Sequence, residues 1–172
     1  MLKIGILGSS GKMGGLRRYL FAQMPDCQVV ALCDTQKPAI HDLPFSTDPY
    51  DIIRNADVDA VCICTPNYLV KDLVIASLNQ GKHVFCEKPM ATDSPGVRSV
   101  MESVRVAKDK KLGLVAGFCW RYDAPRREFY ARVLDGAIGE IRAVHATYLT
   151  GPVKPMPPAD KRPAGMGDIE WQ

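Results

Sequence analysis

Apolar runs and amphipathic segments alternate along the chain from residue 2 to about residue 118. The strand-like runs are residues 2–8, 27–34, 59–65, 83–89 and 112–118. The segments with apolar residues at helical spacing are residues 11–24, 48–56, 68–80 and 94–111. Because the strand-like runs are continuously apolar, they are typical of strands buried on both faces. The pattern predicts an α/β fold in which helices cover both faces of a doubly wound parallel sheet.

The predicted helices carry their own start and stop signals. Asp48 is an expected N-cap with Pro49 at the first helical position, and Gly81 is an expected C-cap of the third helix. The apolar faces of the first and fourth helices consist of Met13, Leu16, Leu20 and Met24, and of Val97, Val100, Met101, Val104 and Ala107. Each set recurs at helical spacing, as expected for helices that cover a sheet.

The pattern changes after residue 118. A helix is predicted from about Pro125 to Leu134, and residues 140–151 alternate apolar and polar side chains as a half-exposed strand does. Residues 152–172 are rich in proline and predict no regular core. A second domain therefore begins and remains incomplete, which predicts uncovered apolar side chains such as Val144 and Tyr148.

The charged residues exclude some classes of partner. The chain has 22 basic and 19 acidic residues, scattered rather than gathered in blocks, and a formal net charge of +3. This weak excess suits an anionic small molecule and gives no case for nucleic acid or an anionic membrane. No run approaches the roughly 18 apolar residues of a membrane span. Without a recognisable signal peptide, a cytoplasmic protein is expected.

Six cysteines carry no metal-binding pattern. They are Cys27, Cys33, Cys62, Cys64, Cys86 and Cys119. No C-x-x-C pair occurs, and five of the six lie within or beside apolar runs. Buried reduced thiols are the simplest interpretation, and no metal site is predicted.

The stretch from Gly8 to Gly14, "GSSGKMG", joins the first strand to the first helix. Glycines at such a junction allow a tight turn, and the helix N-terminus that follows offers free N–H groups to a phosphate. The spacing is Gly-x-x-Gly-x-x-Gly, with Ser10 where the strict dinucleotide fingerprint has glycine. A plain glycine-rich turn is the alternative on these seven residues alone.

Asp34 strengthens the nucleotide interpretation. It ends the second strand, 20 residues beyond Gly14. An acid at this place can accept hydrogen bonds from both ribose hydroxyls of an adenosine and repel a 2′-phosphate. NAD is therefore expected in preference to NADP. Lys37 is the one nearby residue that could weaken this preference. A strand-end aspartate that caps a turn is the alternative.

Two further strand ends carry polar residues. Thr65 and Asn67 flank Pro66, and either side chain can contact a ligand, although Asn67 can equally cap the next helix.

Lys88 follows Glu87 at the end of the 83–89 strand, where an ammonium group can exchange a proton with a substrate hydroxyl. Glu87 can hold or counter-charge the site, and the Lys88–Pro89 bond is a candidate cis peptide. A solvent-exposed turn remains the alternative.

Three segments together resemble a known family: "GILGSSGKMG", "DAVCICTPNYLVKDLVIASLNQGKHVFCEKPMATD" and "VAGFCWRYDAPRREFYARVLDGAIGEIRAVHA". They are similar, in this order, to the glucose-fructose oxidoreductase / inositol dehydrogenase / MocA family of sugar and polyol dehydrogenases. The resemblance covers roughly residues 2–148, and "GKHVFCEKP" is its most specific part.

The resemblance implies an NAD(P)-binding Rossmann domain, placed here at residues 1–122. It implies the beginning of an α+β substrate and oligomerisation domain at residues 123–172, and a homo-oligomer. The implied reaction is hydride transfer between a nicotinamide cofactor and a sugar, inositol or related polyol, with Lys88 as the catalytic residue that helps to move the hydroxyl proton. Together, motifs and resemblance predict these cofactor-binding residues: Gly8, Ser10, Gly11, Lys12, Met13, Gly14, Asp34, Thr65, Pro66, Asn67, Glu87, Lys88, Trp120 and Arg121.

Two departures from the family keep alternatives open. The loop "GSSGKMG" is closer to that of dihydrodipicolinate reductases, although that family's His-His and Lys-x-Asp-Ala-Pro-Ser-Gly signatures are absent. The family usually continues for about as many residues again, so the chain is expected to be a truncated product or a fragment. A nucleotide-binding module without turnover is therefore the second hypothesis, and a dihydrodipicolinate-type reductase the third.

Overall fold

The computed structural model describes residues 1–38, 42–151, 158–162 and 164–167. These residues fall into two compact units, Met1–Gly117 and Phe118–Gly167, which we describe separately. The predicted domain division at residue 122 stays a prediction, and the structural division lies a few residues before it.

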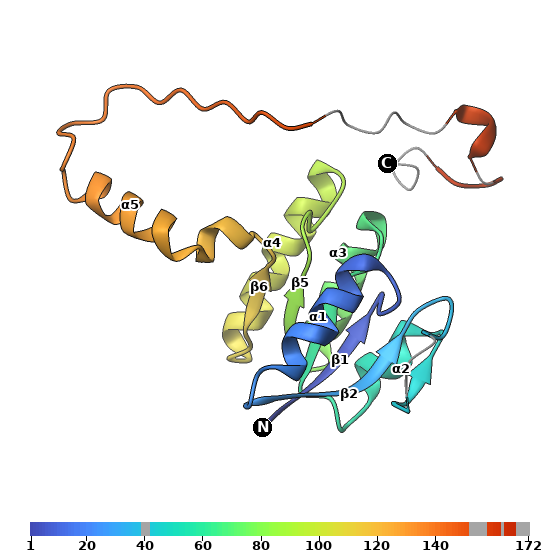
Figure 1. Cartoon of the computed structure of the whole chain (residues 1–172). Helices are drawn as coiled ribbons and strands as arrows, with labels where there is room; N and C mark the ends of the chain where they lie inside the picture. Colours follow the sequence, from blue (N-terminus) through green and yellow to red (C-terminus); the bar gives the residue numbers. More distant parts are fainter. Residues whose placement is uncertain (39–41, 152–157, 163, 168–172) are drawn as a thin grey trace. The chain divides into compact units, whose positions relative to one another are not determined.

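The first unit is built on one parallel sheet of six strands in the order β3-β2-β1-β4-β5-β6 (Figure 1). The strands are β1 Leu2–Leu7, β2 Cys27–Cys33, β3 Phe45–Ser46, β4 Ala60–Ile63, β5 His83–Cys86 and β6 Leu114–Ala116. This is the strand order of the doubly wound Rossmann fold, so the predicted fold class is confirmed. The sequence pattern missed only β3, whose two residues pair with the end of β2.

The register brings the carboxyl ends of the central strands to one edge. Leu7 at the end of β1 pairs with Ile63 of β4, and Ile63 pairs with Cys86 of β5. The loops that follow these strands therefore begin side by side at the carboxyl edge of the sheet. This edge is where ligands of doubly wound sheets bind.

Four helices connect the strands: α1 Lys12–Ala22, α2 Pro49–Arg54, α3 Asn67–Asn79 and α4 Ser94–Asp109. The predicted cap of α2 is confirmed, because the Asp48 carboxylate accepts a hydrogen bond from the Tyr50 N–H at 2.9 Å. Gly81, with φ of +76°, follows α3 as expected. In α4 the buried positions are Gly96, Val100, Ser103 and Ala107.

The predicted apolar face of α4 is therefore partly wrong, since Val97 is 47% exposed and Met101 65% exposed. Small residues take their place because α4 packs against α3 at close range. A Cβ on Gly96 would lie 3.4 Å from the Lys71 side chain of α3. The Ser103 hydroxyl is accommodated there by donating to the Ser99 carbonyl.

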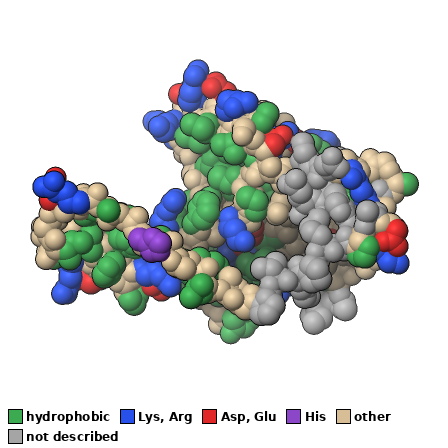
Figure 2. Space-filling model, turned by 90° about the horizontal axis from the view of Figure 1, so that it is seen from above, with side chains coloured by type: hydrophobic (Ala, Val, Ile, Leu, Met, Phe, Trp, Pro, Cys, Tyr) green, Lys and Arg blue, Asp and Glu red, His purple; other side chains and the backbone are tan. Residues whose placement is uncertain are grey.

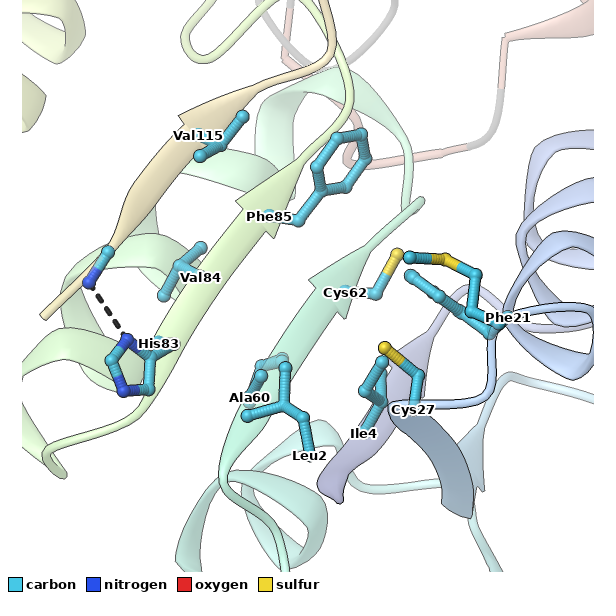
Figure 3. A pocket seen from close by; sticks show the side chains of 13 residues that line it. Leu2, Ile4, Phe21, Cys27, Ala60, Cys62, His83, Val84, Phe85 and Val115 are labelled. Atoms are coloured by element: carbon cyan, nitrogen blue, oxygen red, sulfur yellow. Dashed lines mark hydrogen bonds between the residues drawn. The ribbon is translucent and has the colours of Figure 1, made fainter.

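The two faces of the sheet differ in their cover. One core joins strand residues to α2, α3 and α4, with side chains such as Ile53, Val74 and Leu78 fully buried. The other face has a smaller core around Ile6 and Cys62, and α1 is the helix that covers it in the described part of the unit (Figure 1). Beside α1 this face forms an apolar hollow of about 280 Å³ (Figure 3).

A second difference from the sequence pattern concerns the apolar face of the first helix. Four apolar side chains of the predicted first helix remain 36 to 49% exposed: Met13, Leu16, Leu20 and Met24. Phe21 points instead toward Cys62 and the strands in Figure 3, and Phe85 and Val115 line the far side. The packing of α1 onto the sheet thus rests on few side chains.

The second unit contains a 3-10 turn at Cys119–Tyr122, the helix α5 at Ala124–Leu134 and a short 3-10 turn at Ala159–Lys161. The strand predicted over residues 140–151 is wrong, because the described chain there is extended but unpaired. A strand needs a neighbour for its backbone groups. As expected, Val144 and Tyr148 are uncovered, at 82% and 71% exposed.

Among the described residues, the structure contains no helix both long enough and apolar enough to cross a membrane.

Candidate functional site

The glycine loop packs directly against the end of β4. Gly8 has φ of +78°, and a Cβ on it would lie 2.6 Å from the carbonyl carbon and oxygen of Cys64. Gly14 is the buried residue of α1, and a side chain there would collide with the Gly8 carbonyl. Both positions therefore require glycine so that α1 can start immediately beyond the strand end.

The N-terminus of α1 is open. Gly11 is the N-cap residue, and apart from its chain neighbours no atom of the described residues lies within 4 Å of where its Cβ would stand. No side chain caps the helix, and its first turn carries no acid. The exposed Lys12 adds a positive charge beside Met13 in that turn. Since helix N-termini attract anions through their N–H groups and dipole, these features fit a phosphate group.

Asp34 is bound to the glycine loop. Its Oδ2 accepts a hydrogen bond from the Ser10 N–H at 2.7 Å, and its Oδ1 accepts one from the Thr35 N–H at 2.7 Å. The Ser10 hydroxyl donates to the Gln36 carbonyl at 2.7 Å. Ser10 therefore ties the loop to the end of β2, a role that its place in the glycine pattern did not indicate.

A cavity of about 310 Å³ opens beside these residues at the carboxyl ends of β1, β2 and β4. Gly8 and Asp34 line one part of it, and Thr65, Pro66 and Leu69 line another. The cavity is mainly apolar, with the Asp34 carboxylate at its wall. Such a mixture of apolar walls and few polar groups is typical of a site for a heterocyclic ring and its sugar.

The residues after β4 supply an unsatisfied hydroxyl group. Thr65 Oγ1 is buried and has no hydrogen-bond partner in the described part of the protein. Pro66 is the N-cap of α3, and Asn67 is its exposed first residue. The idea that Asn67 caps the helix is therefore wrong. A buried polar atom without a partner fits contact with a bound ligand.

The turn after β5 carries Glu87, Lys88 and Pro89. The Glu87 N–H donates to the Ile63 carbonyl at 2.9 Å, which holds the turn against β4. The Lys88–Pro89 bond is cis, as the sequence indicated. Lys88 is exposed, and within the described residues no hydrogen bond or ion pair engages its ammonium group.

Sequence reasoning missed Arg17, which links the two parts of the site. Its Nε and Nη2 donate to Glu87 Oε1 at 2.8 and 2.5 Å. The two residues are 70 positions apart, and Arg17 looks like a surface charge on an amphipathic helix. Its place three residues after Gly14 was the one available signal, because that puts it one turn from the glycine loop.

Trp120 and Arg121 belong to the second unit. There the Arg126 guanidinium lies 4.3 Å from the ring centroid of Trp120. The Arg121 guanidinium lies 5.1 Å from the ring centroid of Phe118. The Trp120 ring also contacts Tyr148, with 5.5 Å between centroids. Their contact with a cofactor stays a prediction.

The buried cysteines are poor nucleophiles. Burial raises the pKa of the Cys33 thiol to about 11 and that of Cys86 to about 12. The pKa of Cys62 is also raised, first by its hydrogen bond with Cys64 and then by burial. These thiols stay protonated at neutral pH. Among the described residues, no cluster of three or more His, Cys, Asp or Glu side chains could hold a metal ion.

Basic side chains do not form one block on the visible surface. Figure 2 shows Lys and Arg in several separate places among apolar and acidic groups. On this face the distribution agrees with the scattered charges of the sequence.

Taken together, the site is that of a dinucleotide-binding doubly wound domain. An open helix N-terminus, an acid at the end of β2, an adjoining cavity and an unpartnered hydroxyl all lie at the carboxyl edge of the sheet. The family model for oxidoreductases with an NAD-binding Rossmann fold matches residues 2–118. The chain belongs to this oxidoreductase family.

Its relatives include inositol dehydrogenases. The chain is 32% identical to inositol 2-dehydrogenase of Rhizobium meliloti over 151 residues, which are 85% of the chain and 44% of the relative. It is 33% identical to inositol 2-dehydrogenase of Salmonella typhimurium over 165 residues, 90% of the chain and 48% of the relative. The chain therefore spans less than half the length of these relatives.

A solved structure shows the same fold. It is scyllo-inositol dehydrogenase from Lactobacillus casei with bound NAD(H) and scyllo-inositol, 27% identical and with a TM-score of 0.68. The match covers 81% of this chain and 43% of that one.

Proposed function

We propose that this chain is the nucleotide-binding part of an NAD-dependent dehydrogenase that acts on an inositol or a related polyol or sugar. The observation that carries the proposal is the shared edge of the sheet, where the glycine loop, Asp34 and the Glu87-Lys88 turn follow β1, β2 and β5. The inositol dehydrogenases among the relatives support the substrate class. They favour this reading over a dihydrodipicolinate-type reductase.

Each half of the edge has its own task. The α1 N-terminus holds the pyrophosphate, and Asp34 accepts hydrogen bonds from the adenosine ribose beside the 310 Å³ cavity. Thr65 and Asn67 lie at the end of β4, next to β1 in the sheet. Because β5 lies on the opposite side of β1 from β2, the nicotinamide end lies beside Glu87 and Lys88.

Bound NAD supplies the hydride acceptor for such a reaction. In its neutral amine form Lys88 takes the proton of the substrate hydroxyl during oxidation, and as the resulting ammonium it returns that proton during reduction. Lys88 is exposed and has no partner among the described residues, which leaves it able to hydrogen-bond a substrate. Glu87 is paired with Arg17, and in the described residues it forms no ion pair with Lys88.

Nucleotide binding is tested first with the 172-residue chain. Titration with NADH and NADPH, followed by cofactor fluorescence, should give tighter binding of NADH, because the Asp34 charge repels a 2′-phosphate. Markedly tighter binding of NADPH would contradict the role of Asp34. If the chain binds neither NADH nor NADPH, the proposed function itself is contradicted.

Turnover is tested with a hybrid in which this chain replaces the matching part of the Rhizobium meliloti enzyme. Inositols and sugars are offered with NAD, and formation of NADH is measured by absorbance. We expect turnover in the hybrid and cofactor binding without turnover in the 172-residue chain, which matches only 44% of that relative. Binding without turnover in both proteins would favour the second candidate, a nucleotide-binding module.

A further inference from the structure

Arg17 forms an ion pair that joins α1 to the turn after β5. Its Nε and Nη2 both donate to one oxygen, Oε1 of Glu87, and the side chains of Arg17 and Glu87 are 19% and 12% exposed. The guanidinium also lies over the Phe85 ring of β5, 4.6 Å from its centroid. A charge pair so largely removed from water, with a second contact to an aromatic face, has one preferred geometry.

Glu87 is held from three directions. Its N–H is bound to the Ile63 carbonyl of β4, and its Oε1 is bound to Arg17 of α1. Its Oε2 faces Gly117, where an added Cβ would lie 2.8 Å away. The carboxylate therefore occupies a fixed place in the turn that carries Lys88, and Arg17 supplies the charge that neutralises it.

We propose that Arg17 is a positioning residue that cancels the Glu87 charge at the nicotinamide end and so sets the balance of affinity between oxidised and reduced cofactor. This inference rests on the proposed function. The oxidised nicotinamide ring carries a positive charge and the reduced ring carries none. A Glu87 carboxylate without Arg17 would attract the oxidised ring selectively, and it would also be free to pair with the Lys88 ammonium.

The test uses Arg17→Met in the 172-residue chain, which keeps side-chain length and removes the charge. NADH affinity is measured by fluorescence titration, and NAD+ affinity by displacement of bound NADH. We expect the ratio of the two affinities to shift toward NAD+ by about fivefold, the order expected for one uncompensated charge near a partly exposed site. An unchanged ratio would overturn the proposal.

Two further variants separate charge from shape. Arg17→Lys keeps the positive charge and should retain the wild-type ratio. The double variant Arg17→Met/Glu87→Gln carries neither charge and should also return to that ratio. If Arg17 were only structural, Arg17→Met would weaken the binding of both cofactors equally and lower the melting temperature, and the ratio would stay at the wild-type value in every variant. That pattern would also overturn the proposal.

A matched control is Arg105→Met, which removes an arginine from the exposed ion pair with Glu102 on α4. It should leave the ratio unchanged, and a shift like that of Arg17→Met would refute a local effect. Failure of the proposed function looks different, because the wild-type chain would then bind neither cofactor. If Arg17→Met does not fold, Glu87→Gln decides the question, because it leaves the Arg17 charge uncompensated and should shift the ratio toward NADH; an unchanged ratio in that variant would overturn the proposal.

Discussion

The two ends of the sheet edge are built in different ways. At the end of β2 the Asp34 carboxylate is bound by two backbone N–H groups, from Ser10 and Thr35, each at 2.7 Å. At the end of β5 the backbone of Glu87 is fixed, but Lys88 next to it is exposed and has no internal partner in the described part of the chain. One end is preorganised, and the other keeps a reactive group free.

The difference follows from what each end is proposed to do. Binding gains from groups that are ordered before the ligand arrives, because less entropy is lost on association. Proton transfer needs a group that can exchange hydrogen-bond partners with the substrate. Substitutions at the two ends should therefore separate affinity from turnover.

The largest effect is expected from Lys88→Met. In the hybrid enzyme, turnover should fall by about 10²–10⁴-fold, the usual contribution of a general acid or base. NADH affinity should remain nearly unchanged, because no contact of the preorganised end is altered. Steady-state kinetics and fluorescence titration measure the two quantities. Lys108→Met on the exposed end of α4 is the control, and unchanged turnover in Lys88→Met would remove Lys88 from the mechanism.

The next effect concerns the fold of the binding end. Gly8→Ala should lower the free energy of unfolding by about 3 kcal/mol or more, since it combines positive φ with a Cβ 2.6 Å from the Cys64 carbonyl. Gly81→Ala is the matched control, because Gly81 has nearly the same φ, +76°, but nothing within 4 Å of its Cβ. It should cost about 1 kcal/mol. Equal losses in denaturant unfolding would show that crowding at Gly8 is unimportant.

A smaller effect is expected at Asp34. Asp34→Ala should weaken NADH and remove the repulsion of NADPH, so that the preference between them changes by about tenfold. Both affinities are measured by fluorescence titration. Asp72→Asn is the control, because Asp72 lines the same cavity but forms its ion pair with Lys71. A similar change in both variants would mean that general charge, and not the place of Asp34, determines the preference.

Much of the sheet could be predicted because its determinants are local. Continuous apolar runs such as residues 59–65 indicated strands that are buried on both faces of the sheet. The capping residues Asp48 and Gly81 marked helix ends. The strand predicted at residues 140–151 failed because strand formation depends on a partner, which the alternating pattern does not reveal. β3 was too short to give any pattern.

The side-chain contacts of the site were harder to predict from the sequence than the sheet was. The contact of Ser10 with Asp34 joins residues 24 positions apart, and that of Arg17 with Glu87 joins residues 70 apart. Both depend on how α1 lies over the sheet, and its exposed apolar face shows that periodicity alone does not determine this placement. The motif residues could be named from the sequence, but not the groups that hold them.

The smallest effect is expected from Thr65→Val, which removes a hydroxyl and keeps the shape. Thr65 Oγ1 is buried without a partner among the described residues, so its loss should stabilise the free chain by roughly 1 kcal/mol in denaturant unfolding. If the hydroxyl serves the cofactor, NADH affinity should fall a few fold in the same variant. Ser9→Ala is the matched control, because Ser9 Oγ is also buried without a partner in the described part of the chain but was not predicted as a ligand contact. Stabilisation in both variants with weaker binding only in Thr65→Val would place the binding function in Thr65 itself. Unchanged NADH affinity in Thr65→Val would show that the preorganised part of the cofactor site includes Asp34 but does not extend to the residues after β4.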